Sequence, residues 1–142
     1  MPMNKTLMKV IGIVHTSLYR MSGGRLTRKM RGSEVVLLTT TGRKSGKKRT
    51  SPLFGLADGD NWTLIASQGG HHEHPNWYLN LRDNPEVELQ VGSKTMRMRA
   101  ETAVGGERDR LWSKMGLMYD GYNDYQKLTR RVIPVVVLKP VD

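Results

Sequence analysis

Two hydrophobic periodicities divide the chain at about residue 31. Before it, apolar residues recur at intervals of three and four, namely Leu7, Val10, Ile11, Val14 and Leu18. This spacing predicts an amphipathic helix from about Asn4 to Arg20, ended by Gly23 and Gly24. After it, apolar and β-branched residues come in short runs separated by turn residues. We therefore expect an N-terminal helix with a basic linker over residues 1–31 and a β-rich domain over residues 32–142.

Residues 32–142 predict six strands and three helices. The strands are expected over residues 35–41, 49–56, 62–67, 86–91, 94–99 and 132–138, and the helices over residues 76–84, 107–118 and 122–128. Pro52 must lie at an edge or a bulge of the second strand, because proline cannot donate to a ladder. Pro140 is expected to end the last strand. Strands joined mostly by short turns, with helices between some of them, are typical of a small closed or half-closed barrel, so the expected class is α+β, mainly β.

The hairpin around Gly92 and Ser93 is predicted together with its register. A two-residue turn there pairs Leu89 with Met96, Val87 with Met98, Glu88 with Arg97 and Glu86 with Arg99. Apolar residues then face apolar residues, and acids face bases. Glycine at the first central position suits a type II′ turn, so local chemistry and register agree.

Composition restricts the chemistry. The 142 residues contain no cysteine, which excludes disulfides, thiolate metal sites and a catalytic thiol. Any redox reaction must therefore rely on a bound cofactor. The first thirty residues lack a long apolar stretch and a small-residue cleavage site, so we expect a cytoplasmic protein. The formal net charge of +10 favours an anionic partner, whether nucleic acid, an anionic membrane or a phosphorylated ligand.

The N-terminal segment has two interpretations. A basic stretch from Arg20 to Arg31 follows the amphipathic helix directly, which is typical of peripheral contact with an anionic membrane surface, here the inner face of the cell membrane. Surface helices of soluble proteins show the same pattern, so the helix could equally pack on the domain's own sheet. The sequence leaves both interpretations open.

A basic turn between the first two predicted strands is the first candidate site. Five of the seven residues from Arg43 to Arg49 are basic, and Gly42 and Gly46 bracket the turn. Backbone N–H groups, a hydroxyl and guanidinium groups together suit a phosphate or carboxylate. A solvated basic hairpin is the alternative. Nucleic acid is disfavoured, because single-strand binders interleave basic residues with stacking aromatics and none lies between Glu34 and Pro52.

A histidine cluster and a tyrosine cluster are the other candidate sites. His71, His72 and His74 are dense enough to suggest a metal site, but consecutive residues of an extended loop point apart, so no metal is expected. Tyr119, Tyr122 and Tyr125 recur every three residues. They could line the mouth of a pocket with their hydroxyls or simply pack in the core, and spacing does not choose between these.

Several ordered motifs together resemble the deazaflavin-dependent nitroreductase family. They are Leu37 to Gly46, Arg49 to Leu53, Ser67 to Gly70, His74 to Leu81, Tyr119 to Tyr125 and Ile133 to Val136, and the match runs in order from about Leu37 to Pro140. The resemblance implies a split β-barrel related to flavin-binding reductases, with coenzyme F-420, an 8-hydroxy-5-deazaflavin, held in a groove. Gln68 stands where some relatives have lysine, and the His71-His72-Glu73 segment also departs from the family pattern, which leaves substrate choice open.

The family's coenzyme carries a phosphate and an oligoglutamate tail, so the resemblance gives the basic turn a ligand. It implies phosphate and tail contacts by Arg43, Lys44, Ser45 and Arg49, with Pro52, Leu53 and Phe54 following on the same groove wall. Thr50 and Ser51 are expected among the cofactor-binding residues as well. The ring would be flanked by Ile65, Ala66, Ser67 and Gln68 and by Asn76, Trp77, Tyr78, Leu79 and Asn80. The three tyrosines would border the substrate, and Ser67 would hydrogen-bond it.

The implied reaction is hydride transfer from reduced coenzyme F-420 to a quinone, a nitroaromatic or an activated alkene. The cofactor supplies the chemistry, while Tyr122 and Ser67 are expected to stabilise or protonate the acceptor. Three alternatives stay open: a flavin mononucleotide reductase of the same fold, a non-catalytic F-420 carrier, and a basic nucleic-acid-binding module.

Overall fold

The computed structural model describes residues 29–30 and 33–141. The predicted helix from Asn4 to Arg20 lies outside the described residues. Seven strands are present in them: β1 (Lys29–Met30), β2 (Ser33–Thr41), β3 (Lys48–Asp58), β4 (Asn61–Ile65), β5 (Glu86–Val91), β6 (Lys94–Thr102) and β7 (Val135–Pro140). The helices are the 3-10 turn η1 (Gln68–Gly70), α2 (Asn76–Asp83), α3 (Gly105–Met118) and α4 (Gly121–Lys127).

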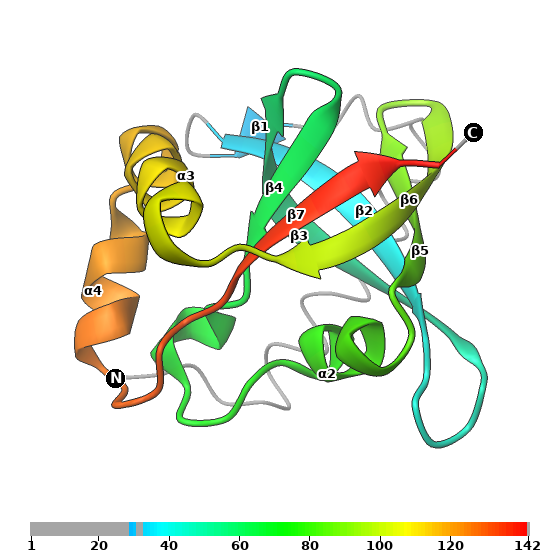
Figure 1. Cartoon of the computed structure of the whole chain (residues 1–142), viewed down its shortest axis with the longest axis horizontal. Helices are drawn as coiled ribbons and strands as arrows, with labels where there is room; N and C mark the ends of the chain where they lie inside the picture. The colour runs from blue at the N-terminus through cyan, green and yellow to red at the C-terminus, as the bar shows by residue number, and fades with distance from the viewer. Residues whose placement is uncertain (1–28, 31–32, 142) are drawn as a thin grey trace.

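Six of the strands form a closed antiparallel barrel (Figure 1). The order β2-β3-β4-β7-β6-β5 closes where Leu37, Leu38 and Thr39 of β2 pair with Gln90, Leu89 and Glu88 of β5. The predicted mainly β, α+β barrel is therefore confirmed. The short strand β1 was not predicted, and it pairs with the start of β2 outside the barrel order.

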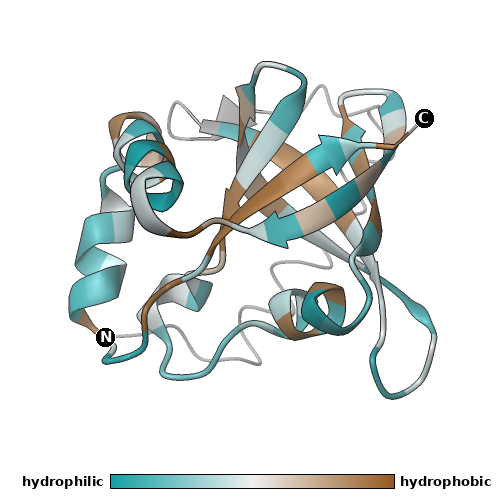
Figure 2. Cartoon of the chain, in the orientation of Figure 1, coloured by the Kyte–Doolittle hydropathy of each residue, from teal (hydrophilic) through white to brown (hydrophobic). Residues whose placement is uncertain are grey.

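The barrel contains one core and supports a second one outside it. Alternate residues of β7 explain both, because successive side chains of a strand point to opposite faces. Val136 and Leu138 pack inside the barrel, whereas Val135 and Val137 pack beneath α3 and α4. From Val135 to Leu138 the strand is consequently apolar on both faces, and Figure 2 shows β7 brown along its length up to a teal tip.

The three helices close different parts of the barrel. Helix α2 lies across one end, where its buried residues Trp77, Tyr78 and Leu81 join the interior core. Helices α3 and α4 lie along one side (Figure 1). Leu111, Met115 and Tyr122 form the outer core there with residues of β4 and β7. No helix of the described residues is both long and apolar enough to cross a bilayer.

The predicted hairpin register is confirmed. All four predicted pairs between β5 and β6 are present. Gly92 has φ 61°, and Ser93 is not among the residues with positive φ, as a type II′ turn requires. Pro52 also lies at an edge: its neighbour on one side is Leu37 of β2, while β4 pairs with β3 only from Gly55 to Asp58.

Two predicted strands include residues that lie outside the observed strands. The last strand begins at Val135 and includes Pro140, which pairs with Met98, so it does not run from 132 to 138. Val132 is 67% exposed and lies in the preceding loop. The third predicted strand, 62–67, ends at Ile65, because Ala66 already donates its N–H to Pro134 O in a loop contact. Apolar runs do not mark where pairing stops.

Candidate functional site

The basic turn joins β2 to β3 and is closed by its own backbone. Gly42 N–H donates to Lys47 O (2.8 Å), Gly46 N–H donates to Gly42 O (2.8 Å), and Lys47 N–H donates to Ser45 Oγ (3.2 Å). Gly46 has φ 72°, a conformation that glycine adopts without strain. The turn is therefore an ordered loop that presents its basic side chains in a defined arrangement.

Arg43 connects this turn to helix α2. Its backbone N–H and Nη1 both donate to Asn80 Oδ1, at 3.1 and 3.0 Å, and Nη2 lies 3.5 Å from Asn76 Oδ1. Asn80 is 4% exposed and donates in turn to Thr40 Oγ1 (3.2 Å). The two predicted binding segments, the basic turn and the start of α2, therefore lie side by side.

The cations of the turn have no acidic partners. Arg43, Lys44, Lys47, Lys48 and Arg49 are all exposed, and no carboxylate within the described ranges forms an ion pair with any of them. Lys48 Nζ is 3.3 Å from Thr41 Oγ1, a neutral contact. Five uncompensated positive charges on one turn create a strong attraction for an anion.

Strand β3 does not present one continuous wall to a ligand. Leu53 packs against the interior core, whereas Phe54 packs against the outer core and contacts Tyr119, with ring centroids 5.6 Å apart. The prediction that Pro52, Leu53 and Phe54 follow on the same wall was therefore wrong, because a strand alternates its faces. On the rest of this segment, Thr50 Oγ1 lies 2.8 Å from Thr39 Oγ1 of β2.

The loop after β4 carries an unusual backbone. Gln68 has φ 46°, which makes it the one non-glycine residue with positive φ in the described chain, and Gly69 and Gly70 follow with φ 61° and 81°. A residue other than glycine adopts this conformation only at a cost in energy. Ser67, just before it, is 8% exposed, and its Oγ makes no hydrogen bond and no side-chain cap within the part of the chain that the structure describes.

Arg131, which sequence reasoning missed, holds this loop. Its guanidinium donates to Ala66 O (3.1 Å), Ser67 O (2.7 Å) and His71 O (2.9 Å), and its Nη1 lies 3.1 Å from His74 Nδ1. Burial lowers the pKa of this guanidinium from its ordinary value. In a chain with 23 Lys and Arg, no spacing singled out this residue.

The histidines of the loop have separate roles. The rings of His71 and His72 stack with centroids 4.3 Å apart instead of pointing apart as expected, and His72 Nε2 lies 3.4 Å from Glu73 Oε1. Burial, followed by the charges of Arg131 and Arg82, lowers the pKa of His74. A neutral His74 can accept a hydrogen bond from Arg131. No group of His, Asp or Glu in the described part of the chain could hold a metal ion.

The three tyrosines form one cluster, in which Tyr122 and Tyr125 of α4 meet Tyr119, the residue that follows α3. Tyr119 Oη and Tyr125 Oη lie 2.9 Å apart, and the Tyr122 ring meets the Tyr119 ring edge-on at 5.1 Å. Tyr122 is 4% exposed and is part of the outer core. Burial and the two neighbouring tyrosines raise its pKa, so its hydroxyl stays protonated. Its hydroxyl makes no hydrogen bond within the described residues.

The predicted cofactor-binding residues fall into an exposed group and a group that is buried or half-buried. Arg43, Lys44, Ser45, Arg49 and Asn76 are exposed. By contrast Ile65, Ala66, Ser67, Trp77, Tyr78 and Asn80 are buried, and Thr50, Ser51, Pro52, Leu53, Phe54, Gln68 and Leu79 are half-buried. Trp77 and Tyr78 serve the barrel core, so these two side chains support the site from beneath. Residue spacing could not separate the two groups, because burial depends on the tertiary contacts.

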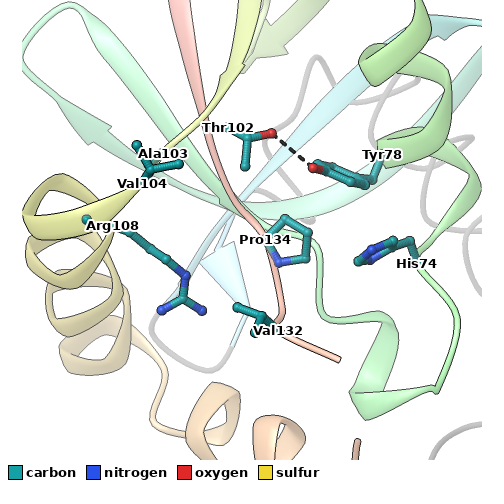
Figure 3. A pocket seen from close by; sticks show the side chains of 9 residues that line it. His74, Tyr78, Thr102, Ala103, Val104, Arg108, Val132 and Pro134 are labelled. Atoms are coloured by element: carbon teal, nitrogen blue, oxygen red, sulfur yellow. Dashed lines mark hydrogen bonds between the residues drawn. The ribbon is translucent and has the colours of Figure 1, made fainter. Parts of the chain in front are cut away.

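A shallow pocket of about 340 Å³ lies on another part of the surface (Figure 3). It is lined by His74, Tyr78, Thr102, Ala103, Val104, Gly105, Arg108, Val132 and Pro134. Tyr78 Oη and Thr102 Oγ1 lie 3.0 Å apart on one wall. Tyr78 alone of the predicted site residues contributes to it.

Comparison with known proteins identifies the relatives. The family model described as F420H(2)-dependent quinone reductase matches residues 13–140. An F420H(2)-dependent quinone reductase of Mycobacterium tuberculosis is 36% identical over 146 residues, covering 97% of this chain and 98% of the relative.

Solved structures agree with this assignment. A structure titled F420-H2 dependent reductase FDR-A is 40% identical with a TM-score of 0.70, covering 77% of this chain and 95% of that one. A second, titled domain-swapped dimer, is 35% identical with a TM-score of 0.71, covering 89% and 97%. The heme storage protein HutZ of Vibrio cholerae is only 15% identical, with a TM-score of 0.58 and coverage of 83% and 85%, so it shares the fold alone. The oxidoreductase class and the coenzyme predicted from the motifs are thereby confirmed, and the chain belongs to the F420H(2)-dependent quinone reductase family.

Proposed function

We propose that this chain transfers a hydride from bound, reduced coenzyme F-420 to a quinone, with nitroaromatics and activated alkenes as further acceptors. The observation that carries the proposal is the basic turn. The turn carries five exposed cations without acidic partners in the described residues, and Arg43 connects it to α2, so it suits a coenzyme with an anionic phosphate and an anionic tail. Family membership supports the same coenzyme.

Lys44, Ser45 and Arg49 are the side chains that we expect to hold the phosphate and the tail. They are exposed and their charged or hydroxyl groups face solvent, apart from the Ser45 contact within the turn. Arg43 has two roles. Its guanidinium and backbone N–H bind Asn80, and this contact keeps the remaining guanidinium N–H donors beside α2, where they can bind the coenzyme. Guanidinium groups bind phosphate and carboxylate in a fixed geometry, which lysine cannot do.

Tyr122 and Ser67 are the residues that we expect to act on the acceptor. When bound, reduced F-420 supplies the hydride. The acceptor oxygen gains negative charge during the transfer, and a hydroxyl donor nearby stabilises that charge. Tyr119 and Tyr125 bond to each other, whereas the Tyr122 hydroxyl is protonated and uncommitted. The Ser67 hydroxyl is uncommitted too, and η1, which Ser67 precedes, packs against α4.

Equilibrium binding tests the cofactor assignment. We expect the purified full-length protein to quench or shift F-420 fluorescence with saturable binding, and to bind flavin mononucleotide at least tenfold more weakly. Tighter binding of flavin mononucleotide would contradict the assignment. Stopped-flow oxidation of bound reduced F-420 by menadione then separates an enzyme from a carrier, because a carrier binds without accelerating the transfer.

The Tyr122→Phe variant tests the proposed donor. Phenylalanine keeps the buried ring and removes only the hydroxyl, so the fold and F-420 affinity should be unchanged. The single-turnover rate with menadione should fall about 10²-fold if the hydroxyl donates in the transition state. Tyr119→Phe is the matched control, since its hydroxyl already bonds Tyr125. Equal rates for wild type and Tyr122→Phe would leave solvent as the proton source.

The N-terminal segment supplies a further part of the proposal. The amphipathic pattern from Asn4 to Arg20 and the basic stretch after it favour contact with an anionic membrane, where lipid-soluble quinones reside. We expect the full-length protein to sediment with anionic vesicles at low salt, and less at high salt because the attraction is screened. Absence of sedimentation at low salt would remove the membrane from the proposal.

A further inference from the structure

The Arg131 side chain is a half-buried cation whose contacts within the described residues include no acid. Its guanidinium is held by three backbone carbonyls and one imidazole, and no carboxylate there contacts it. A buried charge is costly unless its hydrogen bonds are well made. All four contacts are made to one short segment, Ala66 to His74, which contains predicted ring-flanking residues.

The backbone around Arg131 reaches a different element. Gln126 of α4 donates from Nε2 to Arg131 O at 2.7 Å, and its Oε1 accepts the N–H of Ile133 at 3.0 Å. One residue thus binds the loop through its side chain and is bound to α4 through its main chain. Helix α4 carries Tyr122, and the loop carries Ser67.

The loop needs such a restraint. Gln68 is in a conformation that costs energy, and it lies next to Ser67, whose carbonyl accepts both Arg131 Nη2 at 2.7 Å and Gly70 N–H at 2.9 Å. Strained backbone persists only where surrounding contacts fix it. The short bond from Arg131 fixes the peptide immediately before the strained residue.

We propose that Arg131 is a positioning residue for hydride transfer, which sets the loop carrying Ser67 against the helix carrying Tyr122. This inference rests on the proposed function. Reacting groups displaced by about 1 Å can lose on the order of 10² in rate, so a link that fixes two elements controls the rate without touching the reactants. The phosphate and the tail of the coenzyme are assigned to the basic turn, which Arg131 does not contact, so we expect the transfer rate to depend on Arg131 more strongly than cofactor affinity does.

The first experiment does not depend on the cofactor. Amide hydrogen exchange by NMR is measured for Gly70 and His71, whose N–H groups donate to Ser67 O and Gln68 O at 2.9 and 3.1 Å. Arg131→Lys keeps the charge but cannot bind several acceptors in a fixed fork. We expect exchange at both amides to accelerate at least tenfold in Arg131→Lys. The control is Arg130→Lys, since Arg130 is exposed and should leave exchange unchanged. Unchanged protection in Arg131→Lys would overturn the inference.

The second experiment measures the reaction. In Arg131→Lys, single-turnover oxidation of bound reduced F-420 by menadione should slow at least tenfold, while the F-420 dissociation constant changes less than threefold. Rates are measured well below the melting temperature of the variant, so lost stability alone would leave them unchanged. Equal rates in Arg131→Lys and wild type would overturn the positioning role. If wild type itself shows no transfer, the proposed function fails, while the exchange measurement still decides whether Arg131 orders the loop.

A milder pair of variants serves if Arg131→Lys does not fold. His74→Leu removes one of the four guanidinium contacts, whereas His74→Asn places a carbonyl oxygen near the position of Nδ1. We expect His74→Leu to accelerate exchange at His71 and to slow hydride transfer about threefold. His74→Asn should restore both towards the wild-type values. Wild-type exchange and rates in His74→Leu would overturn the inference.

Discussion

The two ends of strand β3 carry opposite arrangements of charge. At the Lys48 end, five cations have no acidic partner in the described structure. At the Asp58 end, the carboxylate accepts from Arg110 Nη1 and Nη2 at 3.1 and 2.7 Å and from Lys114 Nζ at 2.9 Å. Paired charges at the second end attach α3 to the β3–β4 turn. At the first end, within the described residues, only Arg43 is bonded to a helix, through Asn80, and the other four cations attach no helix, which is why they point to a ligand.

The largest effect should come from removing unpaired cations. In Lys44→Ala/Arg49→Ala, two charge-assisted contacts are lost, each worth roughly 1.5–3 kcal/mol, so F-420 should bind about 10²-fold more weakly or worse. The melting temperature should not fall, because neither side chain holds the fold. Fluorescence titration measures the first effect and calorimetry the second. Lys94→Ala/Arg97→Ala removes the same charge from the β5–β6 hairpin, and an equal loss of affinity there would indicate a general field effect.

Asn80 should affect both binding and stability. It is buried and accepts two hydrogen bonds from Arg43, so Asn80→Ala releases the basic turn from α2 and removes the Nδ2 donor from the buried Thr40 Oγ1. We expect F-420 affinity to fall about tenfold and the melting temperature to fall by several degrees. Asn76→Ala is the control, because its contact with Arg43 is long and exposed, at 3.5 Å. Equal effects in the two variants would contradict the anchoring role of Asn80.

Asp58→Asn should lower stability and leave F-420 binding unchanged. Hydrogen bonds from Arg110, and then from Lys114, hold the pKa of Asp58 well below its ordinary value. Because the folded pKa is lower than the unfolded value of about 3.9, the stabilisation is present above that pH and is lost as pH falls through the folded pKa. We expect a melting temperature about 3–8 °C lower at pH 7, with the difference from wild type shrinking below pH 4. Asp60→Asn, in the same turn, should be neutral at both pH values.

Features fixed by local sequence were predictable, whereas features fixed by tertiary contacts were not. The β5–β6 register was predictable, because side-chain alternation and the Gly92 turn are local features that agree with each other. The basic turn was also visible in sequence as a dense run. Whether its charges were paired was not visible, because ion pairing depends on tertiary contacts and not on distance along the chain.

Contacts between distant segments were beyond prediction. Arg131 lies about sixty residues after the loop that it holds, with sequence separations of 64 and 65 to Ser67 and Ala66. Nothing local distinguishes such an arginine from a solvated one. The sequence also left open whether Tyr122 lines a pocket or packs in the core. The packing of α3 and α4 decides this, because it buries the Tyr122 ring and leaves its hydroxyl without a hydrogen bond in the described residues.

Glu107→Gln should give the smallest effect, and it tests which contacts matter at the Asp58 end. Glu107 Oε1 lies 3.0 Å from Arg110 Nη2, but the two side chains are 52% and 49% exposed. Solvent screens such a pair, and exposed pairs contribute little to stability. Arg110 keeps both of its bonds to Asp58, whose side chain is only 19% exposed. We therefore expect the melting temperature to change by less than about 2 °C at pH 7. A loss as large as that of Asp58→Asn would mean that the charge of Glu107, and not the two bonds to Asp58, holds Arg110 in place and attaches α3 to the barrel.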